Sequence, residues 1–274
     1  MKNNRKGLKA LICIAMFCFP VLTSFVDPGD TVQNKPFKIR TIVIDAGHGG
    51  KDPGAHGSYS VERSVALSIA KKLRAAIEDN LPSVKVVMTR DDNTFIELRH
   101  RSAIANEIHA NLFISIHCNS SPEGTASIAH KQKGIMVLVY GFHNKGDQME
   151  ALRENASIEL EKNYKENYES YNENDPSNLI VLNAYMQKYR KQSILFGDLL
   201  MKQFKATGDR ETLGVKEQDV LVLAHSAMPA VLIETGFINN SSEEDYLNSA
   251  TGQAEIVNSI VNAIEEYKSE VDIK

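Results

Sequence analysis

Apolar and polar positions along the chain alternate between short apolar runs and amphipathic stretches. Apolar runs rich in β-branched residues predict strands at 41–44, 84–89, 111–117, 134–140, 220–223 and 229–234. Apolar residues at helical spacing predict helices at 61–78, 94–106, 147–168, 182–207 and 241–267. Strands that alternate with helices are typical of an α/β fold. We therefore expect a single domain with a mostly parallel or mixed sheet, helices on both faces and a helical insertion.

The first 24 residues do not fit this pattern. Four basic residues precede an apolar run over 11–22, as in a secretory signal peptide: Lys2, Arg5, Lys6 and Lys9. The run is short for a membrane span, although an uncleaved anchor is an alternative. We expect cleavage near residue 24 and export to the periplasm. A linker over 25–37, a folded domain over 38–268 and a tail over 269–274 would follow.

The net charge and the number of cysteines limit which partners and disulfides can be expected. Removing the signal segment deletes four positive and no negative residues, so the formal net charge falls from -4 to -8. An acidic mature protein argues against nucleic acid and anionic membrane as partners, and we expect no stable membrane insertion. Cys118 is the one cysteine beyond that segment, so no internal disulfide is expected.

Four polar residues lie at strand ends or directly after them. His48 follows the first strand in a glycine-rich loop, while His117 and Glu234 end two later strands. Glu62 opens the helix after the His48 loop. Because the carboxyl ends of parallel strands gather at one edge of a sheet, we expect these side chains to converge.

Such a set of side chains suits a hydrolytic zinc site. Two imidazoles and a carboxylate can bind zinc while a position stays open for water, and a second carboxylate can carry protons. No G-x-S-x-G, H-E-x-x-H or P-loop spacing occurs. Each residue also has an ordinary alternative: a hydrogen-bonded strand end for His117, a first-turn acid for Glu62 and an ion pair for Glu234.

The other arginines, histidines and the cysteine that could take part in a site are expected to have ordinary structural or solvated roles. Arg99 and Arg101 are expected to be solvated or salt-bridged, although either could face an anionic substrate. Cys118 adjoins His117, but neighbours on a strand point to opposite faces, so we expect it to pack as a small apolar residue. Four loop histidines are expected to be solvated, with the last as a reserve ligand: His56, His130, His143 and His225.

The stretch from Gly141 to about Leu182 is rich in charged residues, Asn and Tyr, and 163–175 is nearly of low complexity. We interpret it as an insertion between sheet elements. The predicted helix over 147–168 carries its apolar residues on one side: Met149, Leu152, Ile158 and Leu160.

Three motifs then resemble those of the zinc-dependent N-acetylmuramoyl-L-alanine amidases of the AmiA/AmiB/AmiC (Amidase_3) family. They are IDAGHGGKDPGA at 44–55, LFISIHCNS at 112–120 and MPAVLIETGFIN at 228–239. The resemblance implies one zinc ion (Zn2+) held by His48, Glu62 and His117, with Glu234 as the catalytic acid/base. It implies a peptidoglycan hydrolase that cleaves the amide between N-acetylmuramic acid and L-alanine of the stem peptide by zinc-activated water.

Two departures from the family pattern affect these expectations. Cys118 stands where the family often has Ala, a small change that should leave the zinc geometry intact. No AMIN, LysM, SPOR or SH3-like module accompanies the domain, so the cleft or a partner would have to locate peptidoglycan.

The insertion at 141–182 resembles the regulatory segment of division-associated members. In those members a helix covers the zinc cleft until a protein activator displaces it. Glu150, Glu154 and Glu159 are the candidates for a glutamate that blocks the zinc. A solvated surface excursion without a regulatory role is the alternative.

Two other functions stay open. A zinc peptidase or deacetylase would cut another bond of the cell wall and leave different termini. A catalytically silent wall-binding module would keep zinc as structure. Glu234 argues against that module, because a structural site is closed by a fourth protein ligand and needs no spare carboxylate.

Overall fold

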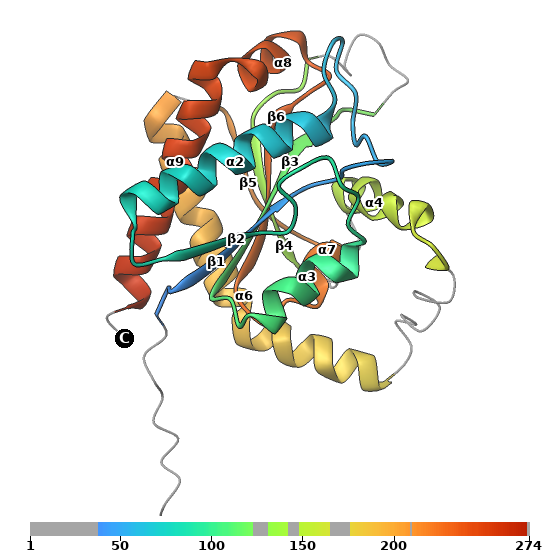
Figure 1. Cartoon of the computed structure of the whole chain (residues 1–274), viewed down its shortest axis with the longest axis vertical. Coiled ribbons are helices and arrows are strands. Elements are labelled where there is room, and N and C mark those ends of the chain that lie inside the picture. The colour runs from blue at the N-terminus through green and yellow to red at the C-terminus, as the bar shows by residue number, and fades with distance from the viewer. Residues whose placement is uncertain (1–37, 123–130, 142–147, 165–175, 209, 273–274) are drawn as a thin grey trace, which may run out of the picture. The chain divides into compact units, whose positions relative to one another are not determined.

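Two long apolar runs form the centre of the sheet. In the computed structural model, which describes residues 38–122, 131–141, 148–164, 176–208 and 210–272, β3 (Leu112–Asn119) and β6 (Ala230–Phe237) are buried along their whole length. The sheet has six strands in the order β2-β1-β3-β6-β4-β5 (Figure 1). The other strands are β1 (Thr41–Ala46), β2 (Lys85–Met88), β4 (Ile135–Tyr140) and β5 (Thr212–Gln218).

Strand direction decides where functional residues can meet. β1, β2, β3 and β6 run parallel to one another, while β4 is antiparallel to β6 and β5 is parallel to β4. The sheet is therefore mixed, which confirms the predicted fold class. The carboxyl ends of β1, β3 and β6 lie side by side at one edge, where ligands bind in open α/β sheets.

Helices cover both faces of this sheet (Figure 1). One layer contains α2 (Glu62–Asn80), α6 (Pro176–Gly208) and α9 (Ala250–Val271), which pack against one another. The other contains α3 (Leu98–Glu107), α4 (Met149–Asn155) and α7 (Leu221–Ala224). Buried residues of this second layer form a core with Val43, Phe113 and Leu232 of the sheet.

The strand predicted at 220–223 is wrong, because that run forms α7. All four helical residues are buried, and a short buried apolar run does not distinguish a helix from a strand. The sequence pattern also missed β5, whose residues are mostly half-buried and include Gly214 at a positive φ of 86°.

The helix predicted over 241–267 is two helices, α8 (Ser241–Asn248) and α9. Extended backbone at Ser249 separates them, and the Ser249 side chain caps α9. The N-cap of α8 is Asn240, whose side chain accepts hydrogen bonds from the amides of Ser242 and Glu243. α9 continues through Val271 and so takes in the first part of the expected tail.

Over the described residues 148–164 of the inserted segment, the predicted continuous helix is interrupted. α4 is followed by a single 3-10 turn, η1 (Ala156–Leu160), and α6 already begins at Pro176, before the expected position 182. Met149 and Leu152, two of the apolar residues of the predicted helix, are 58% and 70% exposed, whereas Glu154 is 3% exposed. The buried side of α4 is thus charged, which requires partners of opposite charge or a metal.

The expected signal segment and linker, residues 1–37, lie outside the described residues. Among the helices that the structure does describe, none has the length and apolar composition of a membrane span.

Candidate metal centre

A sharp turn after β1 presents His48 at the sheet edge. His48 has a left-handed φ of 59°, and Gly49 and Gly50 also have positive φ, so the chain reverses at once. Asp52 orients the ring, with its Oδ2 2.8 Å from Nδ1 of His48. This contact leaves Nε2 facing the site, an arrangement common for metal-binding histidines.

Glu62 is the first residue of α2, and backbone donors fix its carboxylate. Its Oε2 accepts a hydrogen bond from the amide of Ala55 at 2.8 Å, and its Oε1 accepts one from the amide of Cys118 at 2.8 Å. Burial raises the pKa of Glu62, but the charge of His48 and hydrogen bonds from His117 and His48 outweigh it and lower the pKa to about 2. The carboxylate is therefore ionised, as a metal ligand must be.

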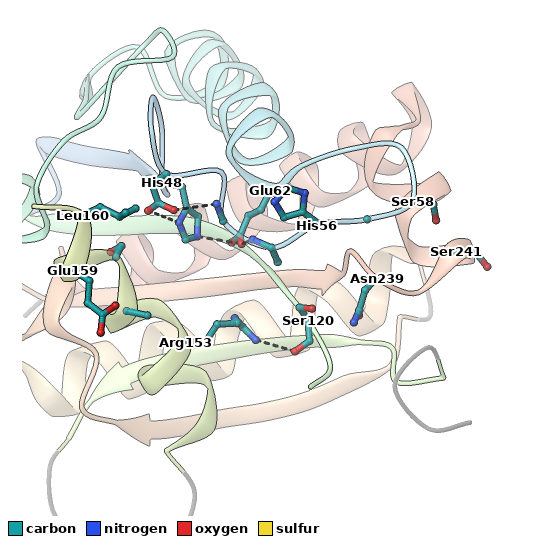
Figure 2. Close-up of a pocket in the computed structure, with 16 residues that line it drawn as sticks. His48, His56, Ser58, Glu62, Ser120, Arg153, Glu159, Leu160, Asn239 and Ser241 are labelled. Carbon is teal, nitrogen blue, oxygen red and sulfur yellow. Dashed lines mark hydrogen bonds and ion pairs between the residues drawn. The ribbon is translucent and has the colours of Figure 1, made fainter. Parts of the chain in front are cut away.

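His117 completes the group at the end of β3. Its Nδ1 lies 3.1 Å from Oε1 of Glu62, and Nε2 of His48 lies 3.1 Å from Oε2 of the same carboxylate. Gly47 gives the second ring its space, because a Cβ there would lie 2.3 Å from Nε2 of His117. Figure 2 shows His48 and Glu62 turned toward one another. The three predicted ligands thus come together from β1, α2 and β3.

A fourth donor comes from the insertion. Oε2 of Glu154 lies 2.7 Å from Nδ1 of His117 and 3.3 Å from Nε2 of His48. The ligand atoms of all four buried residues lie within 4.8 Å of one another. Of the three candidate glutamates, Glu154 is the one at the site. Glu150 instead contacts Gln218, and Glu159 is exposed at the rim.

The donors fit a metal ion. Nε2 of His48 and Oε2 of Glu154 are buried and lack a hydrogen-bond partner of good geometry among the described residues, despite their close approach. Burial lowers the pKa of His117, yet the carboxylates of Glu154 and Glu62 raise it to about 9. The pocket therefore attracts a cation, and imidazole nitrogens with carboxylate oxygens are zinc ligands.

Glu234 adjoins this group without belonging to it. It pairs with His117 in the register of β6 and β3 and is fully buried. Arg153 of α4 approaches it, with Nη2 2.6 Å from Oε1 of Glu234. Burial raises the pKa of Glu234, and Glu154 and Glu62 add to this effect against the charge of Arg153, giving a value of about 8.

Arg153 is a residue that the sequence pattern did not single out. Besides Glu234, it contacts Oε1 of Glu154 at 2.8 Å, and its Nη1 donates to Oδ1 of Asn119 at 2.7 Å and to the carbonyl of Ser120 at 3.1 Å (Figure 2). Its position directly before Glu154 was the only available signal. Asp52, inside the first motif, also received no role from the sequence.

The other candidate residues lie elsewhere. His225 is half-buried and lies outside the group of four possible metal ligands, so it does not serve as a reserve ligand. Arg101 is buried and paired with Asp45 at 2.9 Å, which matches a salt bridge and not a solvated position. Cys118 is buried as predicted. His56 is exposed beside the site, and His130 and His143 lie outside the described residues.

Comparison with known proteins identifies the family of the chain. The family model described as N-acetylmuramoyl-L-alanine amidase matches residues 42–266. The chain belongs to this family.

Individual relatives show how far the similarity extends. The amidase is 30% identical over 253 residues to AmiC of Escherichia coli O6:H1, covering 90% of this chain and 57% of AmiC. It is 36% identical over 233 residues to a putative N-acetylmuramoyl-L-alanine amidase of Buchnera aphidicola subsp. Baizongia pistaciae, covering 82% and 95%. The amidase crystal structure from Clostridium difficile 630 superimposes with a TM-score of 0.62 at 25% identity, covering 84% and 97%. The predicted family, enzyme class and fold are confirmed.

A cavity of about 1030 Å³ opens beside the metal centre of the amidase. The loop over 54–58 lines one side, and residues of α4 and η1 line another (Figure 2). Glu244 of α8 anchors the end of that loop, accepting hydrogen bonds from the amides of Ser58, Tyr59 and Ser60 at 2.8, 2.9 and 2.9 Å. The insertion is therefore a wall of the cavity that leads to the metal centre.

Proposed function

We propose that the amidase binds one zinc ion through His48, Glu62 and His117 and hydrolyses the amide bond between N-acetylmuramic acid and L-alanine of peptidoglycan. The convergence of these three buried side chains beside Glu234 carries the proposal. The three side chains come from different elements of the structure, so they meet only in the folded protein. Family membership supports the choice of substrate.

The residues can be given separate tasks. A bound zinc ion would polarise the amide carbonyl and lower the pKa of water. Glu234 accepts a proton from the attacking water and then donates it to the departing amine. A carboxyl group whose pKa lies near the working pH suits both transfers. His48, Glu62 and His117 would hold the ion, with the His48 ring oriented by Asp52 and the Glu62 carboxylate by two backbone amides.

We infer that the arrangement with α4 in place is a latent form of the enzyme. A catalytic zinc site has three protein ligands and one open position, and Glu154 supplies a donor where that position should be. Arg153 simultaneously pairs with the proposed base. Both residues belong to the insertion, and none of the three ligands does. A protein activator that moves α4 away would free the ion and the base together.

A second function has one observation in its favour. Four protein donors are typical of a structural zinc site, so a wall-binding module without activity would also account for Glu154. Against it, the buried carboxylate of Glu234 adjoins the site and would have no use in such a module. A zinc peptidase or deacetylase shares the chemistry and differs only in the bond that it cuts.

Cleavage products and metal content distinguish these functions. Purified peptidoglycan would be incubated with the wild type and with Glu154→Ala, and mass spectrometry would identify the new termini. We expect one zinc per chain and stem peptides that begin with a free L-alanine amino group. His117→Ala is the control that should lose the metal. New termini at another bond would assign a peptidase or deacetylase, and zinc without cleavage in both proteins would favour the structural module.

The N-terminal pattern and the proposed substrate support one location. Basic residues followed by an apolar run indicate export, and peptidoglycan lies outside the inner membrane. We infer that the protein acts in the periplasm after removal of its signal peptide. N-terminal sequencing of the exported protein should begin near residue 25.

A further inference from the structure

Two buried arginines lie beneath the turn that carries His48. Arg90 is 4% exposed and Arg101 is 1% exposed, although arginine is rarely buried to this extent without partners. Arg101 pairs with Asp45, whose carboxylate also accepts hydrogen bonds from Thr89 and Ser115. The four hydrogen bonds described for Arg90 all end on backbone carbonyl oxygens.

These hydrogen bonds reach the residues next to two proposed ligands. Arg101 donates from Nη2 to the carbonyl of His48 at 2.7 Å and from Nη1 to that of Ala46 at 2.8 Å. Arg90 donates from Nε to Ala46 at 2.8 Å. Its Nη2 donates to the carbonyl of Gly47 at 2.6 Å and to that of Arg63 at 2.9 Å. Gly47 precedes His48 and Arg63 follows Glu62, so one nitrogen links the turn of β1 to the first turn of α2.

The turn needs such support. His48 has a positive φ, which residues with a side chain adopt at a cost. Three successive carbonyls, those of 46, 47 and 48, point to guanidinium groups and would otherwise be buried without a donor. A guanidinium group suits this task because its planar fork donates in several fixed directions, whereas a lysine ammonium does not present that fork.

We propose that Arg90 and Arg101 are positioning residues of the metal centre, which set the His48 ring and the Glu62 carboxylate at the spacing that one ion requires. Neither arginine contacts a ligand atom, so both act through the backbone. The inference rests on the proposed zinc site, but it does not depend on which bond the enzyme cuts.

Arg90→Lys and Arg101→Lys test this proposal, since each keeps the charge and removes the fork. The dissociation constant for zinc would be measured by competition with a chromogenic chelator, and thermal unfolding would be measured on the metal-free protein. We expect the zinc dissociation constant of each variant to rise about 10- to 100-fold, the usual effect of losing a partner that orients ligands. Arg74→Lys, on an exposed helix position paired with Glu78, should leave it unchanged.

A second measurement separates positioning from general stability. The visible spectrum of the cobalt-substituted protein reports ligand geometry, and it should change in both variants and not in Arg74→Lys. A variant that is less stable but binds zinc as the wild type does, with an unchanged cobalt spectrum, would overturn the inference. Metal-free variants that no longer unfold cooperatively would also overturn it, by assigning the arginines to the stability of the whole domain. A wild type that binds no zinc would instead contradict the proposed function.

Discussion

The two sides of the metal centre are held in different ways. On the sheet side, the carboxylate of Glu62 accepts hydrogen bonds from two backbone amides. The backbone carbonyls of the His48 turn accept hydrogen bonds from two buried arginines. On the insertion side, Arg153 and Glu154 reach the centre through side-chain contacts with His48, His117 and Glu234 and through two hydrogen bonds of Arg153 near Ser120.

Residues near both ends of 148–164, a described part of the insertion, are attached in a similar way. Lys51 donates to the carbonyl of Leu160, and Glu161 accepts a hydrogen bond from the amide of Leu98 at 2.8 Å. At the other end, the side chain of Gln148 accepts from the amide of Asp219 at 2.8 Å. Side-chain contacts of this kind can break without unfolding a strand. Under the latent form proposed above, the sheet side is the permanent part of the site and the insertion side is the part that an activator displaces.

The largest change in activity should come from a substitution on the sheet side of the site. Glu234→Gln removes the proposed proton carrier while keeping the size of the side chain, so turnover on peptidoglycan should fall by about 1000-fold. Zinc content should stay at that of the wild type, since the three ligands remain. Metal analysis and product release would be measured on the same samples. Turnover close to that of the wild type would refute the role of Glu234.

A substitution on the insertion side of the site should instead raise the activity. Arg153→Ala removes the ion pair with Glu234 and loosens α4, and a hydrogen-bonded charge pair contributes about 1.5 to 3 kcal/mol. Basal activity should rise by about tenfold, measured as peptide release from peptidoglycan. Arg190→Ala is a matched control, because it breaks a partly exposed ion pair between Arg190 of α6 and Glu217 of β5. Equal activity of Arg153→Ala and the wild type would count against a restraining role.

The smallest effect concerns the loop that borders the cavity on the sheet side. Burial raises the pKa of Glu244, but the hydrogen bonds from Tyr59, Ser58 and Ser60 outweigh it and lower the pKa from 4.5 to about 2. A carboxyl group with a lowered folded-state pKa stabilises the protein above pH 4.5, and this contribution is lost as the pH falls toward 2.

Glu244→Gln should therefore lower the melting temperature by about 5 °C at pH 7, with a difference from the wild type that shrinks between pH 4.5 and pH 2. Thermal unfolding of both proteins across this range is the measurement. A difference that stays constant with pH would show that the ionised carboxylate does not stabilise the loop.

The sequence was most informative where polar residues follow apolar runs. His117 and Glu234 end such a run, and His48 follows one. Parallel strands have their carboxyl ends at one edge of a sheet, so these residues meet although they are far apart in the sequence. The existence of β5 was not predictable in the same way, because the half-buried residues of this edge strand carry a weak pattern. The direction of β4 was not predictable either, because a buried apolar run can form a parallel or an antiparallel strand.

The apolar side of α4 does not face the core, for a physical reason. An apolar stripe is expected to face inward when a helix packs on an apolar surface. α4 packs partly on the metal centre, so Glu154 faces inward while Met149 and Leu152 face solvent. Apart from Asp45, which pairs with Arg101, the acceptors of Arg90 and Arg101 are backbone carbonyls, which every residue possesses. No residue type in the sequence could therefore indicate that these arginines would be buried.

The zinc content and basal activity of Glu154→Ala test the central claim most directly. If Glu154 closes the open position of a latent enzyme, the variant should keep one zinc on its three remaining ligands and release stem peptides at least tenfold faster than the wild type. Loss of the zinc with no gain in activity would show that Glu154 is a structural ligand, and would contradict the account.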